Sequence, residues 1–129
     1  MNGVKTNMER EIIPLKKLSK NELKNLLSEL KQIIINIYGE SLKKIILYGS
    51  YARRDYRSES DIDVMILASG SKFELKTFFE KAVIATNELD IKYGIFVSII
   101  DVNIKDFDEY INYVPFYANV YKEGTKIYG

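Results

Sequence analysis

Two apolar runs in the middle of the chain are separated by a polar segment whose two ends are distinctive. Residues 47–67 read LYGSYARRDYRSESDIDVMIL, so a Gly-Ser pair follows the first run and Asp-Ile-Asp opens the second. Short apolar runs bounded by turn residues are typical of buried strands. Carboxylates at the start of a buried strand cost stability unless something neutralises their charge. This segment therefore constrains both the fold and the chemistry of the chain.

Helical and strand-like patterns alternate along the rest of the sequence. Ser19-Lys20-Asn21-Glu22 has the form of a capping box, and the leucines and isoleucines after it recur at helical spacing as far as Gly39. Further along, the pattern predicts strands over residues 44–48, 62–68 and 95–101, helices over 73–89 and 105–113, and a last helix and terminal strand in the tail. This order predicts a small mixed sheet with helices on one face, in an α/β or α+β domain. We expect one domain over residues 19–129 and an N-terminal arm over residues 1–18.

Composition narrows the possible chemistry. The 129 residues include neither cysteine nor histidine, which excludes disulfides, thiolate catalysis, a Ser-His-Asp triad and the usual zinc ligands. Any reaction must use carboxylates, hydroxyls, lysine and arginine, and a bound metal would be a hard cation such as Mg²⁺ or Mn²⁺. The formal net charge of +1 gives no global attraction to nucleic acid. No apolar run is long enough to span a membrane, so we expect a soluble cytoplasmic protein.

The two aspartates suit a metal site. Asp61 and Asp63 lie two apart on a predicted strand, so both side chains leave the same face, with Cα atoms about 6.5–7 Å apart. Carboxylates placed in this way can share one or two Mg²⁺ ions. Two ions about 3.5–4 Å apart form the usual clamp for in-line phosphoryl displacement. Magnesium commonly takes one or two carboxylates together with substrate phosphates.

The Gly-Ser pair suits a phosphate. Gly49 lets the backbone approach a phosphate closely, and Ser50 offers a hydroxyl beside its own N–H. If a helical turn begins there, its N-terminus also favours an anion. Arg53 and Arg54 add guanidinium groups, which match phosphate oxygens. If the two strands are neighbours, this pair lies next to the aspartates.

Each half of this pattern has an ordinary explanation. A lone Asp-x-Asp at a strand edge is usually a solvated loop end, and Gly-Ser alone is a turn. The combination at a fixed spacing should arise by chance in roughly one chain of this length in several hundred. An apolar run that predicts a strand also precedes the Gly-Ser pair, and another carries the Asp-x-Asp pair. The combination therefore favours a functional site.

The segment GSYARRDYRSESDID resembles the Gly-Ser-x10-Asp-x-Asp signature of the DNA polymerase β-like nucleotidyltransferase superfamily. It is especially similar to the minimal nucleotidyltransferases paired with HEPN-domain toxins. The resemblance implies a small mixed sheet flanked by helices and transfer of AMP from ATP, with Mg²⁺, to a tyrosine of the toxin. It also implies that Gly49 and Ser50 hold the triphosphate and that Asp61 and Asp63 bind metal. Arg53 matches the arginine of the Gly-Ser-x-Ala-Arg-Gly motif that is common in the family.

The sequence departs from this family at two places. Arg54 stands where the family usually has glycine. Complete members also have a third carboxylate on the next strand, and here that position falls near Phe96 or Val97. Asp101 shares a strand face with Val97 but lies some 13 Å further along. Asp101 is therefore either a third metal ligand or an ordinary acid at a strand end, and Asp90, before the strand, is equally open.

Three functions remain. The leading hypothesis is a Mg²⁺-dependent nucleotidyltransferase that moves AMP from ATP to a hydroxyl of a HEPN-type toxin and so acts as its antitoxin, without binding nucleic acid. The second is a degenerate binding module that neutralises its partner by contact, motivated by Phe96 in place of an acid. The third is transfer to a small molecule, which the short chain disfavours because little remains to build an acceptor pocket.

Overall fold

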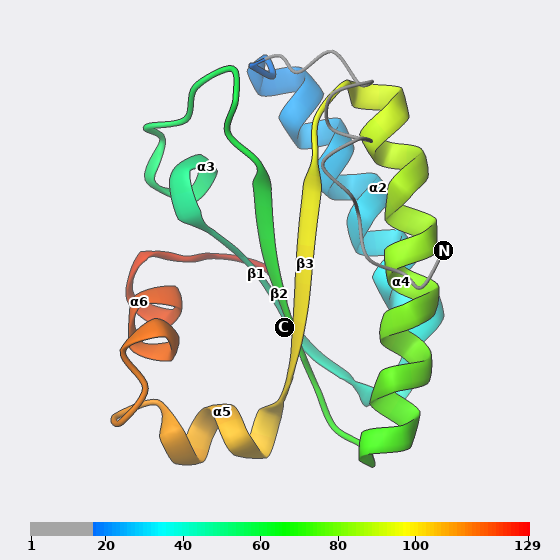
Figure 1. Ribbon diagram of the computed structural model, residues 1–129, viewed down its shortest axis with the longest axis vertical. Helices are drawn as coiled ribbons and strands as arrows, with labels where there is room; N and C mark the ends of the chain where they lie inside the picture. Colours follow the sequence, from blue (N-terminus) through cyan, green and yellow to red (C-terminus); the bar gives the residue numbers. More distant parts are fainter. Residues whose placement is uncertain (1–16) are drawn as a thin grey trace.

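The computed structural model describes residues 17–129 (Figure 1). They form a four-stranded sheet flanked by helices. In chain order the elements are α2 (Lys20–Tyr38), the 3-10 turn η1 (Gly39–Ser41), β1 (Leu42–Tyr48), α3 (Gly49–Arg53), β2 (Ile62–Ala68), α4 (Lys72–Tyr93), β3 (Val97–Asn103), α5 (Ile104–Tyr110), α6 (Pro115–Glu123) and β4 (Thr125–Tyr128). The predicted mixed α/β class is confirmed.

Local sequence signals fix the ends of the two long helices. In α2 the Ser19 side chain accepts from the N–H of Glu22, whose carboxylate accepts from the N–H of Ser19, so the predicted capping box is present. Ser71 and Glu74 form the same arrangement at the start of α4. The helix α4 continues to Tyr93, four residues beyond the predicted end, and Gly94 then ends it in the left-handed conformation.

The strands of the sheet lie in the order β3-β2-β1-β4. Strand β1 pairs antiparallel with β2, and the pairing places Tyr48 opposite Asp63. Strand β2 pairs parallel with β3, which places Asp63 beside Ser98. Parallel neighbours need a long crossover, and α4 provides it. The β1–β2 pairing brings the Gly-Ser turn to the start of the Asp-x-Asp strand.

Helices cover both faces of the sheet, so the prediction of helices on one face is wrong (Figure 1). Alternate strand residues, among them Ile62, Val64 and Ile66, pack with α2 and α4 in the larger core. The intervening residues Met65 and Leu67 pack with α5 and α6 in a second, smaller core. Phe107 of α5 and Val120 of α6 are buried and dock the two C-terminal helices on the far face, through long-range contacts that a local pattern does not reveal.

The predicted arm over residues 1–18 lies outside the described residues except for Lys17 and Leu18. Leu18 is buried in the larger core, and its N–H donates to the Tyr51 hydroxyl at 3.3 Å. Within residues 17–129 no helix is long and apolar enough to cross a membrane.

Candidate active site

Gly49 brings the backbone against the carboxylate of Asp63. It follows the last residue of β1 and begins α3, with a φ of +73° that side chains rarely adopt. A Cβ at this position would contact the Asp63 carboxylate oxygen and would lie 3.3 Å from Asp63 Cγ. Only glycine therefore permits both this turn and this close approach. The helical turn that the sequence allowed after the Gly-Ser pair is present as α3.

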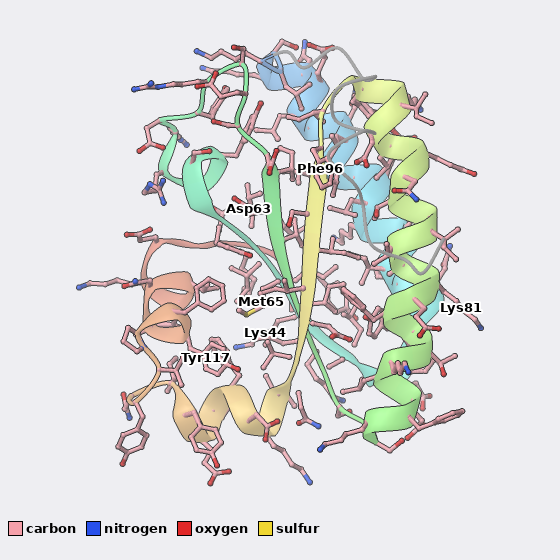
Figure 2. The ribbon with its side chains drawn as sticks, viewed as in Figure 1. Lys44, Asp63, Met65, Lys81, Phe96 and Tyr117 are labelled. Atoms are coloured by element: carbon pink, nitrogen blue, oxygen red, sulfur yellow. The ribbon has the colours of Figure 1, made fainter. Side chains whose placement is uncertain are left out.

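Asp61 and Asp63 stand at the start of β2, on the side of the sheet that faces α6. Asp61 directly precedes the strand, Asp63 is its second residue, and Ile62 between them is buried in the larger core on the opposite face. Because side chains alternate along a strand, the two aspartates lie on the face opposite to Ile62. Both are half-buried. Figure 2 shows Asp63 beside α3 and Met65 further along the same strand.

Tyr48 is the cross-strand partner of Asp63, and the sequence analysis did not single it out. Burial raises the pKa of the Tyr48 phenol to about 12, with a smaller contribution from the negative charge of Asp63. The Tyr48 ring packs edge-on against Phe116 of α6, with ring centroids 5.5 Å apart. A phenol with this pKa keeps its proton at neutral pH, so Tyr48 can donate a hydrogen bond but cannot serve as a base.

A pocket of about 260 Å³ opens beside Gly49. We call it the Gly49 pocket, and it is lined by Tyr48, Gly49, Arg53, Phe116, Asn119, Val120 and Glu123. Arg53 donates to Asp55 at 3.2 Å and to Glu123 at 3.4 Å, and all three side chains are exposed. The pocket therefore offers a guanidinium group that carboxylates hold in place, next to the backbone of the Gly-Ser turn. Ser50 follows Gly49 in α3, and its carbonyl oxygen accepts from the N–H of Asp55 at 3.1 Å.

Arg54 lines a different pocket from Arg53. It ends α3 in the left-handed conformation, with a φ of +65°, and within residues 17–129 it is the one non-glycine residue with positive φ. The pocket that Arg54 lines measures about 640 Å³ and is also lined by Lys17, Lys20, Leu23, Lys24, Leu27, Tyr51 and Tyr56. A glycine would adopt this backbone without strain. Arg54 does not line the Gly49 pocket, so it contributes no guanidinium group there.

The next strand brings no carboxylate to the face of Asp63. The register of β2 and β3 places Ser98 beside Asp63, and the N–H of Ile62 donates to the carbonyl of Phe96 at 2.9 Å. Phe96 and Ser98 alternate with Val97, which is buried in the larger core. Of the two positions predicted for a third acid, only Phe96 faces the site, and Figure 2 shows it near the start of β3.

The structure does not bring Asp101 to the two aspartates. Asp101 pairs with Ile66, three residues further along β2 than Asp63, and it accepts a hydrogen bond from the Tyr38 hydroxyl of α2 at 3.1 Å. It therefore lies on the opposite face of the sheet and cannot share a cation with Asp63. Burial raises the pKa of Asp101, and the Tyr38 hydrogen bond only partly offsets this.

Asp90 is a structural acid. It is 3 % exposed, and its carboxylate accepts from the N–H of Val97 at 2.8 Å, which ties the end of α4 to the start of β3. Within residues 17–129, no three carboxylates come together in a way that could hold a metal ion. Any metal at this site would therefore rest on Asp61, Asp63 and a substrate.

Comparison with known proteins identifies the family. The profile described as polymerase beta, nucleotidyltransferase, matches residues 21–129. The chain belongs to the polymerase β nucleotidyltransferase family. This nucleotidyltransferase is 37 % identical to two proteins of Methanocaldococcus jannaschii that carry the provisional name protein adenylyltransferase. One match spans 91 residues, 70 % of this chain and 83 % of the relative. The other spans 98 residues, 71 % of this chain and 95 % of the relative.

A solved structure described as a toxin–antitoxin with AMP-PNP is 19 % identical to this nucleotidyltransferase. The match covers 87 % of this nucleotidyltransferase and 74 % of the solved chain, with a TM-score of 0.47. The family assignment rests on the sequence match over residues 21–129. The predicted family and enzyme class are confirmed at this level.

Sequence reasoning missed four residues around the site: Tyr48, Ser98, Phe116 and Glu123. Alternation along residues 44–48 and 95–101 shows which residues of its own strand share a face with Tyr48 and which share a face with Ser98. It does not show that these faces lie together, because the sequence contains no signal for strand register. Phe116 and Glu123 reach the Gly49 pocket only because α6 docks against α3, which is a long-range contact.

Proposed function

We propose that this protein transfers AMP from ATP to a hydroxyl group of a partner protein. The observation that carries the proposal is the close approach of the Gly49 backbone to Asp63, which brings the Gly-Ser turn and the Asp-x-Asp strand together. Family membership supports the reaction class, and the provisional name of the two relatives supports a protein as acceptor.

The residues present fit a magnesium ion. Asp61 and Asp63 are two half-buried carboxylates on one face, and Mg²⁺ usually takes one or two carboxylates together with substrate phosphates. One or two ions held by Asp61 and Asp63 would neutralise phosphate charge during the displacement. The family resemblance and the donor set favour magnesium over softer metals.

The other side chains and the backbone position ATP in this proposal. Gly49 and Ser50 present their backbone to the triphosphate, and Arg53 contacts phosphate oxygens from the wall of the Gly49 pocket. An acceptor oxygen forms a bond to the α-phosphorus while the bond from that phosphorus to the bridging oxygen breaks. Pyrophosphate leaves with the electron pair, and the acceptor's proton passes to solvent.

Transfer without a general base should be slow. Among the described residues, Phe96, which precedes β3, and Ser98 of β3 face the site, and neither can accept a proton efficiently at neutral pH. A well-placed general base typically contributes about 10²- to 10⁴-fold to a rate. An acceptor that enters as a tyrosine would partly compensate, because a phenol ionises more readily than an aliphatic alcohol. For this reason, and from the family resemblance, we propose a tyrosine of a HEPN-type toxin as the acceptor, the protein acting as antitoxin in the cytoplasm.

Label transfer from α-phosphate-labelled ATP tests the proposal. The protein and its Asp61→Asn and Asp63→Asn variants are added separately, with Mg²⁺, to lysate of the source cells. We expect a labelled protein band with the unmodified chain and none with either variant. A band of equal strength with Asp63→Asn, or no band with any of the three, would contradict the proposal.

The arrangement of β3 favours a second candidate function. Because Phe96 occupies the face where the family resemblance implies an acid, the protein could neutralise a toxin by contact alone. In that case Asp63→Asn would still restore growth to cells that express the toxin. Loss of neutralisation in this variant, with the folded fraction unchanged, would exclude the binding module.

A further inference from the structure

Four aromatic side chains are exposed on α5, α6 and the turn between them. They are Tyr110, Tyr113, Phe116 and Tyr121, and we call them together the aromatic patch. Tyr113 is 79 % exposed and Tyr121 is 67 % exposed. The four side chains present on the order of 400 Å² of surface, about half of what one partner contributes to a standard-size interface.

One residue of the patch reaches the proposed reaction site. Phe116 lines the Gly49 pocket and packs against Tyr48, the cross-strand partner of Asp63. The turn that carries the patch is held by backbone hydrogen bonds, in which the N–H groups of Tyr113 and Val114 both donate to the carbonyl of Tyr110 at 2.9 Å. A protein seated on α5 and α6 would lie next to the Gly49 pocket.

The charges around the patch indicate what kind of surface fits it. The acidic side chains are concentrated on α5, where Asp106, Asp108 and Glu109 are exposed beside Lys105. On α6, Lys122 is exposed, and the exposed Glu123 is paired with Arg53. A twofold contact with a second copy would set this acidic surface against itself, which costs energy. A partner with apolar and basic side chains complements it instead. Aromatic residues are also the type most enriched among those that carry binding energy in interfaces.

We propose that the aromatic patch is the docking surface for the protein that carries the acceptor hydroxyl, and that this protein presents an apolar and basic surface to it. The inference rests on the proposed function. It places the acceptor protein over α5 and α6, so that its hydroxyl approaches across Phe116.

The test uses the variant Tyr113→Ala/Tyr121→Ala, since both side chains are exposed and neither lines the Gly49 pocket. The matched control is Ile84→Ala/Ile91→Ala, which removes two side chains that are 63 % and 74 % exposed on α4, across the sheet from the patch (Figure 1). The initial rate of label transfer from α-phosphate-labelled ATP is measured in lysate of the source cells, diluted until the rate is proportional to lysate. The affinity for Mg-ATP is measured in parallel by calorimetry.

We expect the patch variant to label the acceptor at least about tenfold more slowly, with its affinity for Mg-ATP unchanged, while the control labels at the original rate. Equal rates for the patch variant and the original protein would overturn the docking surface and leave the proposed function intact. So would sedimentation that showed a dimer lost in the patch variant, because a second copy would then be the occupant. No labelling by the original protein would refute the proposed function and this inference with it.

Discussion

Gly49→Ala tests whether the site depends on the close approach between the β1–α3 turn and Asp63. The substitution has two separable effects. The φ of +73° costs a residue with a Cβ roughly 1–2 kcal/mol in the free energy of unfolding. The new Cβ would also contact the Asp63 carboxylate, with Asp63 Cγ at 3.3 Å and Asp63 Cβ at 3.4 Å, so the carboxylate must move. A displacement of about 1 Å in a catalytic group can lower a rate by about 10²-fold.

Gly39→Ala is the matched control. Gly39 has a φ of +55°, and a Cβ there meets nothing within 4 Å. Urea unfolding should show a loss of stability in both variants, on the order of 1–3 kcal/mol, because each places a residue with a Cβ at a positive φ that such residues rarely adopt. Label transfer from ATP should fall by about 10²-fold in Gly49→Ala alone. If the two variants transfer label at the same rate, the contact between Gly49 and Asp63 does not position the site, and the reasoning fails.

Two further variants probe charges around the site. Asp101→Asn should leave label transfer unchanged and raise the free energy of unfolding at pH 7. The folded-state pKa of Asp101 lies above its usual 3.8, so the folded chain keeps this proton to higher pH and stability falls as pH rises through that window. In unfolding curves, the extra stability of Asp101→Asn should vanish below about pH 3.8. A loss of label transfer in this variant would contradict the prediction and would make Asp101 part of the site. Glu123→Gln should tighten ATP binding by about two- to fivefold in calorimetry, because it releases Arg53 and removes a negative charge from the pocket. Weaker binding would mean that Glu123 positions Arg53.

Local sequence signals account for much of the fold. The sequence predicts a strand over residues 62–68, and β2 occupies those same residues. The capping box at Ser19 and the helix and strand of the tail are also confirmed. Strand β3 begins at Val97 rather than at residue 95, because the residues after Gly94 connect α4 to the sheet before strand pairing starts. Such boundaries depend on tertiary contacts that a local pattern does not contain.

The arrangement of the site could not be predicted without the register of the sheet. Alternation correctly groups Asp101 with Val97, but it does not say that this face is opposite to Asp63. That follows only from the parallel pairing of β2 with β3. The docking of α6, which brings Phe116 and Glu123 to the Gly49 pocket, likewise follows from packing on the far face of the sheet. The roles of Gly49, Ser50 and the two aspartates stay predictions.

Calorimetric titration of ATP into the protein tests most directly whether the Gly-Ser turn and the Asp-x-Asp strand form one Mg-ATP site. The titration is run with Mg²⁺ and with a chelator, on the original chain and on Asp63→Asn. We predict binding by the original chain that depends on Mg²⁺, and an affinity at least about tenfold lower for Asp63→Asn, since removal of a charged partner typically costs 1.5–3 kcal/mol. Equal affinity for the two proteins, or binding by the original chain that the chelator does not change, would contradict the account.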